Sequence, residues 1–317
     1  MKIIKTLTVI VCSFALLSCS EDNASPLRIG TNIWPGYEPL YLARHKNYLN
    51  DKKIQLVEFS SASQVIQAYR NELIDAAALT LDEAILLLQA NEDFSVVLVM
   101  DLSDGADAIV AQKDIASFRD IKGKRIGVEN NALGAYVISR ALAIENTSKE
   151  DVKLIPLDVN EQEKAFINKE VDAVVTFEPV KSILLNAGGR VIFDSTNMPG
   201  EIVDIMIVRN SYLNNHVDNV QHLLDAWYQA LDYTTKYPNK AAGILGRRMQ
   251  LNVTDTLATY KGLKLPNQAD NIAFLRGKKP KLITTSKRMA TLMYEQQLIK
   301  KQLNPEILFQ NKTVKHR

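Results

Sequence analysis

Short apolar runs alternate with longer amphipathic stretches along the chain from residue 27 to residue 210. The runs at residues 54–59, 75–79, 152–157 and 172–177 have the length of buried strands, and the stretches between them repeat apolar residues at helical spacing. Strands that alternate with helices form parallel sheets covered by helices on both faces. The pattern therefore predicts an α/β protein.

The pattern changes toward the C-terminus. Residues 202–209 form an apolar run rich in β-branched residues, which predicts a strand that returns to an earlier sheet. From residue 217 to about residue 303 the spacing is helical, with breaks at Pro238, Pro266 and Pro280. A tail so poor in strands is expected to pack on the first half of the fold.

Two lobes follow from this order of elements. We expect the chain to pass between them near residues 102–108 and again near residues 200–204, so that lobe 1 comprises residues 27–102 and 208–317 and lobe 2 comprises residues 103–207. Two such crossings make a hinge, and lobes joined by a hinge can close on a molecule held between them.

An internal repeat supports the two-lobe prediction. Residues 28–30 (Arg-Ile-Gly) recur at 125–127, and residues 68–76 are matched by residues 165–173 at the same offset of 97 positions. Two matches in one register indicate two copies of a single strand-and-helix unit.

The N-terminus has the layout of an export signal. Lys2 and Lys5 precede an apolar run at residues 7–17 that is too short to span a bilayer as a helix. Residues 16–19 (Leu-Leu-Ser-Cys) resemble a bacterial lipobox, in which the cysteine becomes the lipidated first residue of the mature protein. We therefore expect a signal peptide at residues 1–18, lipidation of Cys19 and a polar tether at residues 19–26. An ordinary signal cleaved after Ser18 or Ser20 is the alternative.

Composition and charge exclude several kinds of function. The chain has 46% hydrophobic and 23% charged residues, which is ordinary for a globular protein. Its net charge of +2 includes Lys2 and Lys5, so the processed chain is near neutral and a role in binding nucleic acid gains no support. Cys12 is the only other cysteine and lies inside the signal, which removes disulfides and thiol chemistry. Basic residues gather at 276–281, as a solvated face or, alternatively, a docking patch.

Three segments carry a resemblance to a known family. Residues 30–43 (GTNIWPGYEPLYLA), residues 121–128 (IKGKRIGV) and residues 172–179 (DAVVTFEP) resemble the periplasmic components of ABC importers for nitrate, sulfonates, taurine and pyrimidine precursors of thiamine. The resemblance implies the two-lobed type II periplasmic-binding-protein fold, with mixed, mostly parallel sheets and a helical C-terminal tail. It further implies a monomer without a cofactor that carries a small polar or heterocyclic molecule to a membrane permease driven by an ATPase.

Ligands of open α/β sheets sit beyond the C-terminal ends of the strands, so the loops there supply the candidate binding residues. Aromatic side chains in such loops offer flat apolar area plus one donor each, although Trp34 could instead anchor the core beneath its loop. An acid at 82 or 178 could instead cap the helix that follows it. These loops contain the candidates Asn32, Trp34, Tyr37, Thr80, Asp82, Thr176 and Glu178.

The second lobe and the crossings contribute further candidates. Asn131 and Gly134 lie in a loop that leads into a helix at residues 136–143, where free backbone N–H groups could hold an anion. Many sulfonate and nitrate binders have a hydroxyl residue here, which this chain lacks, and no Arg or Lys gathers among the candidates. Gly105 lies at the first crossing.

The acidic residues near the crossings suggest the chemistry of the ligand. Asp204 stands in an otherwise apolar strand, where a buried carboxylate is costly without a partner. Together with Asp107 and Glu178 it makes the cleft more acidic than basic, which favours a ligand with N–H donors or positive charge.

Two other kinds of function are compatible with this fold. Pyrimidine synthases share this fold and resemble metal-dependent enzymes with clustered His and Cys, but the four histidines here (His45, His216, His222 and His316) show no H-x-x-x-H spacing, so no catalysis is expected. A membrane-bound sensor that docks on a signalling receptor would need the same closure on a solute as a transport protein. Export to the periplasmic face of a bacterial membrane is expected in either case.

Overall fold

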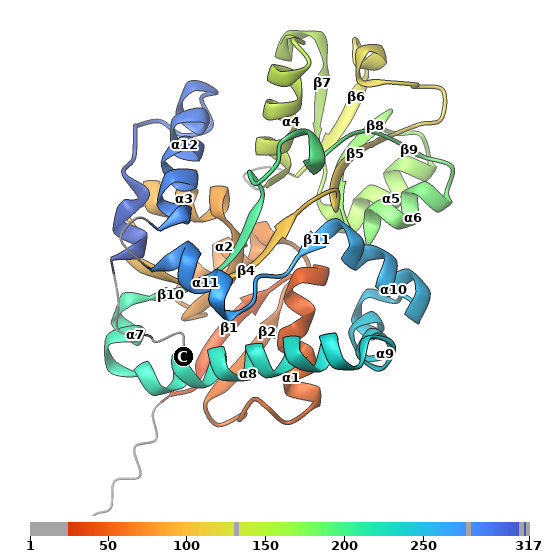
Figure 1. Ribbon diagram of the computed structural model, residues 1–317. Coiled ribbons are helices and arrows are strands. Elements are labelled where there is room, and N and C mark those ends of the chain that lie inside the picture. The colour runs from red at the N-terminus through yellow and green to blue at the C-terminus, as the bar shows by residue number, and fades with distance from the viewer. Residues whose placement is uncertain (1–24, 130–132, 277–279, 311–313, 315–317) are drawn as a thin grey trace, which may run out of the picture.

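The computed structural model describes residues 25–129, 133–276, 280–310 and 314. Two β-sheets, each covered by helices, form a lower and an upper lobe in the view of Figure 1. The predicted two-lobed α/β fold with mixed sheets is therefore confirmed, but the sheets are not mostly parallel, because five of the nine strand pairs in the described residues are antiparallel. The predicted signal peptide, the lipidation site Cys19 and the candidate Asn131 lie outside the described residues.

The sheet of the first lobe has the order β11-β4-β10-β3-β1-β2. Its core strand β1 pairs in parallel with β2 and β3, whereas β10 returns antiparallel between β3 and β4. The strands are β1 (Leu27–Thr31), β2 (Ile54–Glu58), β3 (Ala76–Thr80), β4 (Phe94–Ser103), β10 (Val203–Arg209) and β11 (Leu263–Lys264).

The sheet of the second lobe has the order β7-β6-β8-β5-β9. Here β6 pairs in parallel with β7 and β8, and β5 is antiparallel to β8 and β9. The strands are β5 (Asp107–Ala111), β6 (Arg125–Val128), β7 (Lys153–Pro156), β8 (Ala173–Phe177) and β9 (Arg190–Asp194). Each sheet thus contains a parallel trio followed by an antiparallel strand, and the predicted strand positions agree with the observed ones to within about two residues.

The internal repeat is visible in the contacts as well as in the sequence. Arg28 and Arg125 each donate a backbone N–H and two guanidinium N–H groups to the aspartate 47 residues later, Asp75 or Asp172. The two strand registers are also equivalent, since Ile29 lies opposite Ala76 and Ile126 opposite Ala173. The structure therefore repeats one unit at the offset of 97.

Helices cover both faces of each sheet. Their starts follow local chemistry: Ser61 caps α2 by accepting the N–H of Gln64, and Pro238 occupies the first position of α9. The helices are α1 (Glu38–His45), α2 (Ala62–Arg70), α3 (Leu81–Gln89), α4 (Leu133–Ile144), α5 (Val159–Ile167), α6 (Val180–Asn186), α7 (Asn210–Asn215), α8 (Val217–Lys236), α9 (Pro238–Met249), α10 (Val253–Thr259), α11 (Gln268–Leu275) and α12 (Lys281–Glu295).

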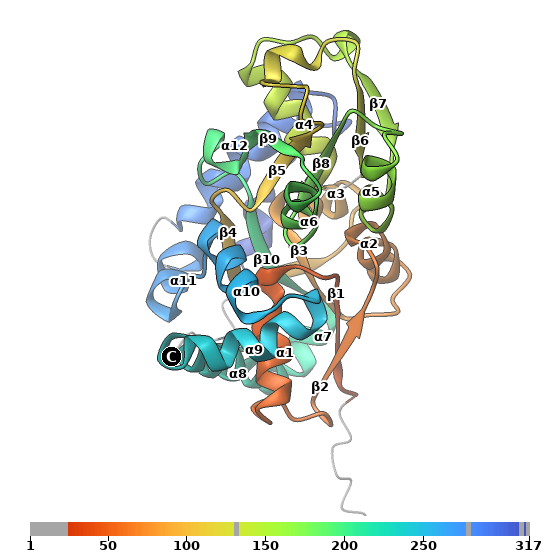
Figure 2. The ribbon, with the colours of Figure 1, turned by 90° about the vertical axis from the view of Figure 1, so that its right-hand side faces the viewer.

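The helical tail packs on the first lobe, as predicted. Helix α8 lies along α1, α12 lies against α3, and α11 lies against β4 (Figures 1 and 2). The tail also supplies β11, a two-residue strand at the edge of the sheet that its helical pattern did not indicate. Among the described residues, none of the helices has the length and apolar content needed to cross a membrane.

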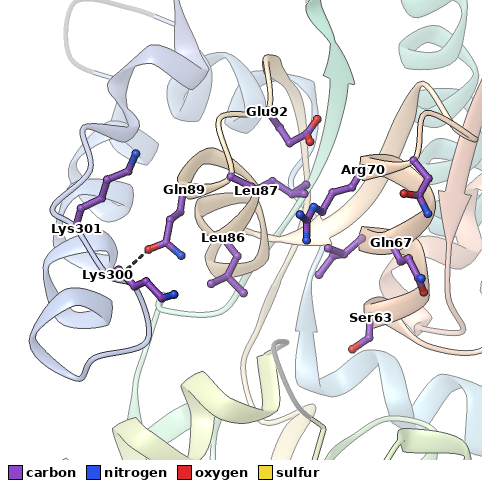
Figure 3. Close-up of a pocket in the computed structure, with 12 residues that line it drawn as sticks. Ser63, Gln67, Arg70, Leu86, Leu87, Gln89, Glu92, Lys300 and Lys301 are labelled. Carbon is purple, nitrogen blue, oxygen red and sulfur yellow. Dashed lines mark hydrogen bonds between the residues drawn. The ribbon is translucent and has the colours of Figure 1, made fainter.

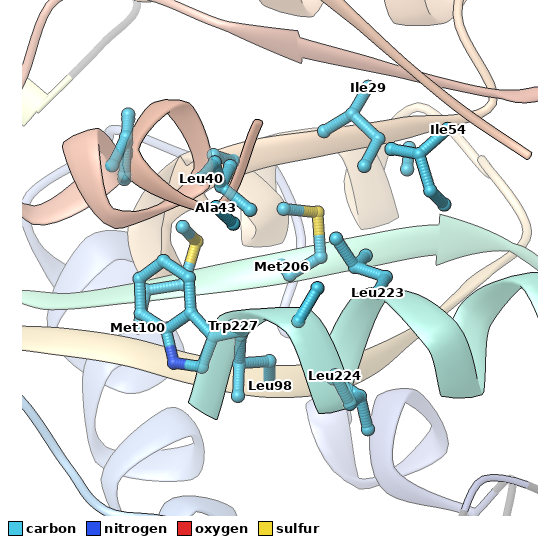
Figure 4. Close-up of a cluster of buried hydrophobic side chains, with 14 of the residues drawn as sticks. Ile29, Leu40, Ala43, Ile54, Leu98, Met100, Met206, Leu223, Leu224 and Trp227 are labelled. Atoms are coloured by element: carbon cyan, nitrogen blue, oxygen red, sulfur yellow. The ribbon is translucent and has the colours of Figure 1, made fainter. Parts of the chain in front are cut away.

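The largest core lies between the first sheet and the tail. Figure 4 shows Trp227 of α8 among Leu98, Met100, Leu40 and Met206, and its side chain is fully buried. Burying each large apolar side chain stabilises the fold by about 1.5–3 kcal/mol. The first lobe therefore has a well-packed core between its sheet and the helical tail.

The chain crosses between the lobes at residues 104–106 and 195–202. The crossings are bonded to each other, because the Gly105 N–H donates to Ser195 Oγ at 2.6 Å and the Ser103 and Ser195 hydroxyls lie 2.8 Å apart. All of β10 pairs within the first sheet, so the predicted lobe boundary at residue 207 is about four residues too late. Asp204 lies inside this strand, as expected, with its backbone paired beside Thr80 and Asp101.

Candidate functional site

A narrow cavity of about 20 Å³, with room for little more than one water molecule, lies between the two lobes in this conformation. Its walls come from the loops and strand ends that face each other across the hinge, as expected for open α/β sheets. It is lined by Asn32, Trp34, Tyr37, Ala62, Thr80, Glu83 and Asp204 on the first lobe and by Asp107, Glu129, Leu133 and Phe177 on the second. A smaller adjoining space of about 10 Å³ shares the last four residues and adds Gly134, Val137, Gln162, Val175 and Thr176.

The aromatic part of the site follows β1. The sequence Trp34-Pro35-Gly36-Tyr37 forms a single 3-10 turn at Pro35–Tyr37 before α1, with proline in the first helical position. A Cβ on Gly36 would lie 1.7 Å from Asp101 Oδ2, so only glycine lets this turn approach β4. The turn directs both aromatic side chains to the cavity wall.

Two aspartates hold these aromatic side chains. Trp34 Nε1 donates to Asp101 Oδ2 at 3.0 Å, and the Tyr37 hydroxyl donates to Asp204 Oδ1 at 2.5 Å. Asp101 and Asp204 lie opposite each other on β4 and β10. Burial raises the pKa of Asp101 to about 7 and raises that of Asp204 well above its usual range, with the Asp101 charge adding to the shift. The pair therefore retains a proton near neutral pH.

Two glutamates join the lobes across the cavity. Glu83 Oε2 accepts the Thr80 N–H at 3.0 Å, and its Oε1 accepts the N–H of Leu133, the first residue of α4, at 3.3 Å. Glu129 Oε1 accepts the N–H and the hydroxyl of Ser63 at 3.3 and 2.8 Å. The Leu133 amide, at the helix end where the sequence suggested an anion, is thus occupied by a carboxyl group of the protein itself.

Asp107 is the carboxylate left without a partner. It is the first residue of β5, its side chain is 1% exposed, and it lines both spaces. By distance and angle, neither of its carboxylate oxygens accepts a hydrogen bond within the described part of the chain, although the Ser103 hydroxyl lies near enough to lower its pKa. Burial raises the pKa of this carboxyl to about 8. Thr176 Oγ1 also lacks a partner there.

An aromatic contact closes the cavity from both sides. The Trp34 and Phe177 rings meet edge to face, with centroids 5.6 Å apart and planes at 84°. Trp34 is 4% exposed and belongs both to the first-lobe core and to the cavity wall. It therefore anchors the core beneath its loop and also lines the cavity.

Three predicted site residues do not line the cavity. Glu178 Oε2 accepts the Ser182 N–H at 3.2 Å, so this acid caps α6. Asp82 is buried in the first turn of α3, and Gly105 lies at the hinge, where its carbonyl accepts a hydrogen bond from Lys181 Nζ at 2.6 Å. Glu178 and Asp82 stand next to strand ends as expected, but their carboxyl groups turn into the protein, whereas Gly105 contributes only backbone groups to the hinge.

Five further residues line the cavity that the sequence did not indicate: Ala62, Glu83, Glu129, Leu133 and Phe177. One signal was available, because Thr80-Leu81-Asp82-Glu83 has the spacing of a capping box and marks Glu83 as the acid that turns back to the strand end. Phe177 ends β8 but was treated as part of a buried strand. No local pattern indicates that Glu129 reaches Ser63 of the other lobe.

Outside the cavity, an ion-pair network spans the lobes. Glu201 lies in the second crossing and pairs with Arg140 of α4 at 2.7 Å and with Arg288 of α12 at 2.8 Å. Burial opposes ionisation of Glu201, but its hydrogen bonds to Arg140 and Tyr136 keep its pKa below the usual range. The network stays charged at neutral pH and holds α4 near the tail.

A second depression is larger but open to solvent. It runs between α2, α3 and residues 300–301, and Figure 3 shows Arg70, Leu86 and Leu87 along it, with the Lys300 N–H bonded to Gln89 Oε1. None of its described lining residues has a buried polar atom without a partner, so the interlobe cavity is the better candidate. Among the described residues, no three or more His, Cys, Asp and Glu side chains are grouped so as to hold a metal ion.

Known proteins share this architecture. The alkanesulfonate-binding protein SsuA from Xanthomonas axonopodis pv. citri, solved bound to MOPS, superposes with a TM-score of 0.75 at 20% identity over 88% of this chain and 96% of that protein. The periplasmic aliphatic sulphonate binding protein SsuA from Escherichia coli gives a TM-score of 0.73 at 20% identity over 91% and 99% of the two chains. At this identity the likeness establishes the fold.

Sequence comparison gives relatives of the same kind. A Bacillus subtilis protein described as aliphatic sulfonates-binding is 24% identical over 247 residues, which cover 73% of this chain and 74% of that protein. The NMT1/THI5 like family matches residues 34–241, which is more than half of the 317 residues and includes the aromatic turn and the start of the tail. The chain belongs to the NMT1/THI5 like family.

Proposed function

We propose that this chain is the solute-binding component of an ABC importer, which captures a small polar or heterocyclic molecule between its lobes and delivers it to a membrane permease. The observation that supports this most directly is the cavity, whose walls come from both lobes and whose polar groups are buried. Relatives described as sulfonate-binding proteins, and a Brachyspira hyodysenteriae protein described as an ABC transporter periplasmic binding protein that is 24% identical, support the same role.

Closure is the step that the contacts support. The hydrogen bonds from Ser63 to Glu129 and from Leu133 to Glu83 pair groups on opposite lobes, and so does the Trp34–Phe177 contact. A solute that bridges the lobes adds its contacts to these and shifts the hinge toward the closed form. The closed form is then the one that the permease recognises.

Export and anchoring complete the proposal. We propose that the chain is exported, loses residues 1–18 and is held at the periplasmic face of the membrane through lipid on Cys19. Two or more acyl chains suffice for a stable anchor. Replacing Cys19 with alanine should move the protein from the membrane fraction to the soluble fraction, and mass spectrometry of the parent should find acyl groups on Cys19.

Distance measurements test capture by closure. The processed chain contains at most Cys19, so with Cys19 replaced by serine, paired cysteines at Gln67 of α2 and Lys164 of α5 can carry a donor and an acceptor dye. These exposed positions are equivalent in the two repeats. A solute that raises the melting temperature should change the distance between the dyes and should be recovered chemically unchanged. Binding without any distance change would contradict closure, and a modified product would contradict a purely binding role.

A further inference from the structure

The carboxylates around the cavity fall into three groups by their partners. Glu83 and Glu129 accept hydrogen bonds across the hinge, and Asp101 and Asp204 hold the donors of the aromatic turn. Asp107 has neither task. Its two oxygens are buried, have no donor in the described residues, and border both connected spaces. A buried carboxylate without a donor is costly, so the site is built for a ligand that brings the donors.

The same cavity is poorly suited to an anion. Its described lining residues include no lysine or arginine. The positive end of α4, which could attract an oxyanion, already has its Leu133 amide bonded to Glu83. Lys181 is engaged elsewhere, because its Nζ donates to the Gly105 carbonyl at 2.6 Å and lies 3.7 Å from Glu178 Oε1.

The aromatic side chains provide the remaining part of the site. Because the Trp34 N–H and the Tyr37 hydroxyl are taken by Asp101 and Asp204, these side chains offer ring surface to a ligand instead of donors. Phe177 adds a third ring on the opposite lobe. Aromatic rings beside a carboxylate stabilise a desolvated cation through their electrostatic quadrupoles.

We propose that the solute captured here carries a cationic nitrogen head, an ammonium or amidinium group, which binds the carboxylate of Asp107 beside the rings of Trp34, Tyr37 and Phe177. This inference rests on the proposed function, since it names the chemistry of the solute that the closing lobes capture. It separates the chain from its relatives described as sulfonate-binding proteins, because a sulfonate brings no N–H donor to the Asp107 oxygens and is repelled by the ionised form of this carboxyl group.

Three probes that differ only in the head group test the proposal. Benzamidine has a cationic head with N–H donors, benzamide a neutral head with N–H donors, and benzenesulfonate an anionic head without them. Acetamidine serves as a small cation that lacks the ring. Measured by calorimetry and by the shift in melting temperature, both amidines should bind, benzamidine at least 10-fold more tightly than benzamide, and benzenesulfonate should not bind. Tighter binding of benzenesulfonate, or no binding of either amidine at millimolar concentration, would overturn the proposal.

Replacement of one carboxylate then tests the residue. Asp107→Asn keeps the shape of the side chain and should weaken amidine binding by about 10- to 100-fold, the range for loss of a charge-assisted contact. Without ligand, this variant should melt at or above the parent temperature, because an unpartnered carboxylate is removed. Glu178→Gln is the control, a change of a buried carboxylate that caps α6 outside the cavity, and it should leave amidine binding unchanged. An equal loss of amidine affinity in both variants would mean that the overall negative charge of this region, and not Asp107 itself, attracts the cation.

The pH dependence provides a second readout. The cation binds ionised Asp107, whose pKa burial raises to about 8, so binding at pH 7 should release a proton and affinity should rise about tenfold from pH 7 to pH 9. The titratable or charged groups around it are Asp101 and Asp204 of the first sheet, Asp82 and Glu83 of α3, Glu129 after β6, and Lys181 of α6. Affinity that falls over this range would contradict the assignment.

Failure of the ligand class and failure of the function give different results. If benzenesulfonate closes the lobes in the distance measurement while the amidines do not, capture by closure stands and the cationic ligand is wrong. If probes bind and the distance between α2 and α5 does not change, the site holds a cation but the proposed capture mechanism fails.

Discussion

Arg28 in the first lobe and Arg125 in the second make the same set of hydrogen bonds, to Asp75 and Asp172, yet the loops that follow their strands differ completely. After β1 the chain forms the aromatic turn, whereas after β6 it presents Glu129. The ion pairs at the starts of the strands hold the framework and lie away from the cavity.

The difference shows how two copies of one unit can form a single site. The first lobe supplies Trp34 and Tyr37 with the aspartates that hold them, and the second supplies Phe177 and the unpartnered Asp107. Because the loops lie at the C-terminal ends of the strands, they can change without disturbing the framework. The copies therefore complement each other at the cavity while remaining alike beneath it.

Replacing one glycine in each of the two loops, Gly36 and Gly134, should show the largest difference in stability between them. Gly36→Ala places a Cβ 1.7 Å from Asp101 Oδ2 and 2.5 Å from Trp34 Nε1, where β4 leaves no room to move. Gly134→Ala, in the loop-to-helix junction of the other lobe, meets the Glu129 backbone at 3.2 Å and gains helix propensity. We expect a loss of about 3 kcal/mol in unfolding free energy for Gly36→Ala and within about 1 kcal/mol of no change for Gly134→Ala.

Urea unfolding of the processed chain measures both changes. The parent and the two variants are compared at one pH and temperature, with the slopes checked for equality. Equal losses in the two variants would mean that the aromatic turn is no more tightly constrained than its counterpart.

Much of the framework could be predicted from the sequence, and the reason is local. The repeat at 97 residues, the strand runs and the helical tail are encoded in spacing that tertiary packing reinforces, so the strand positions and the mixed two-sheet fold agree with the structure. The boundary at residue 207 fell inside the strand predicted at residues 202–209, because the apolar pattern does not show that the whole strand belongs to the first sheet. Spacing alone cannot show that Tyr37 bonds to Asp204 from 167 positions away.

The site was less predictable than the framework. Asn32, Trp34, Tyr37, Thr80 and Asp204 line the cavity because strand ends must meet there, and that rule depends only on topology. Glu178 and Asp82 obey the same rule in position, yet their carboxyls turn into the protein. Which of several neighbouring acids faces the cavity depends on side-chain packing between distant segments, and the sequence alone does not specify it.

Exchanging the aromatic residues at two equivalent positions of the repeat should give the next largest change in unfolding free energy. Tyr69 of α2 and Phe166 of α5 are 97 residues apart, and both are buried. The Tyr69 hydroxyl has no hydrogen-bond partner in the described residues, so Tyr69→Phe should change the unfolding free energy by less than about 0.5 kcal/mol. Phe166→Tyr adds a hydroxyl at the ring end that faces Gly189, where space is short, and should cost about 1–3 kcal/mol.

Thermal and urea unfolding of the two single variants test this exchange. A cost for Tyr69→Phe as large as that for Phe166→Tyr would show that the Tyr69 hydroxyl has a stabilising partner. The double variant provides a further test. Because the two sites are far apart, their changes in unfolding free energy should add if the lobes unfold together.

The ion pairs at the strand starts should give the smallest effect, because their guanidinium groups are partly exposed and solvent screens them. Hydrogen bonds from Arg125 hold the pKa of Asp172 below its ordinary value. A carboxyl with a lowered pKa in the folded state stabilises the fold above its unfolded pKa of about 3.9, and this contribution disappears as the pH falls through the folded value. Asp172→Asn should therefore lower the urea midpoint at pH 7, and the difference from the parent should shrink between pH 4 and pH 2. Asp75→Asn in the first lobe is the matched variant. A loss in Asp172→Asn that persists at pH 2 would assign the effect to the geometry of the strand start instead of to charge.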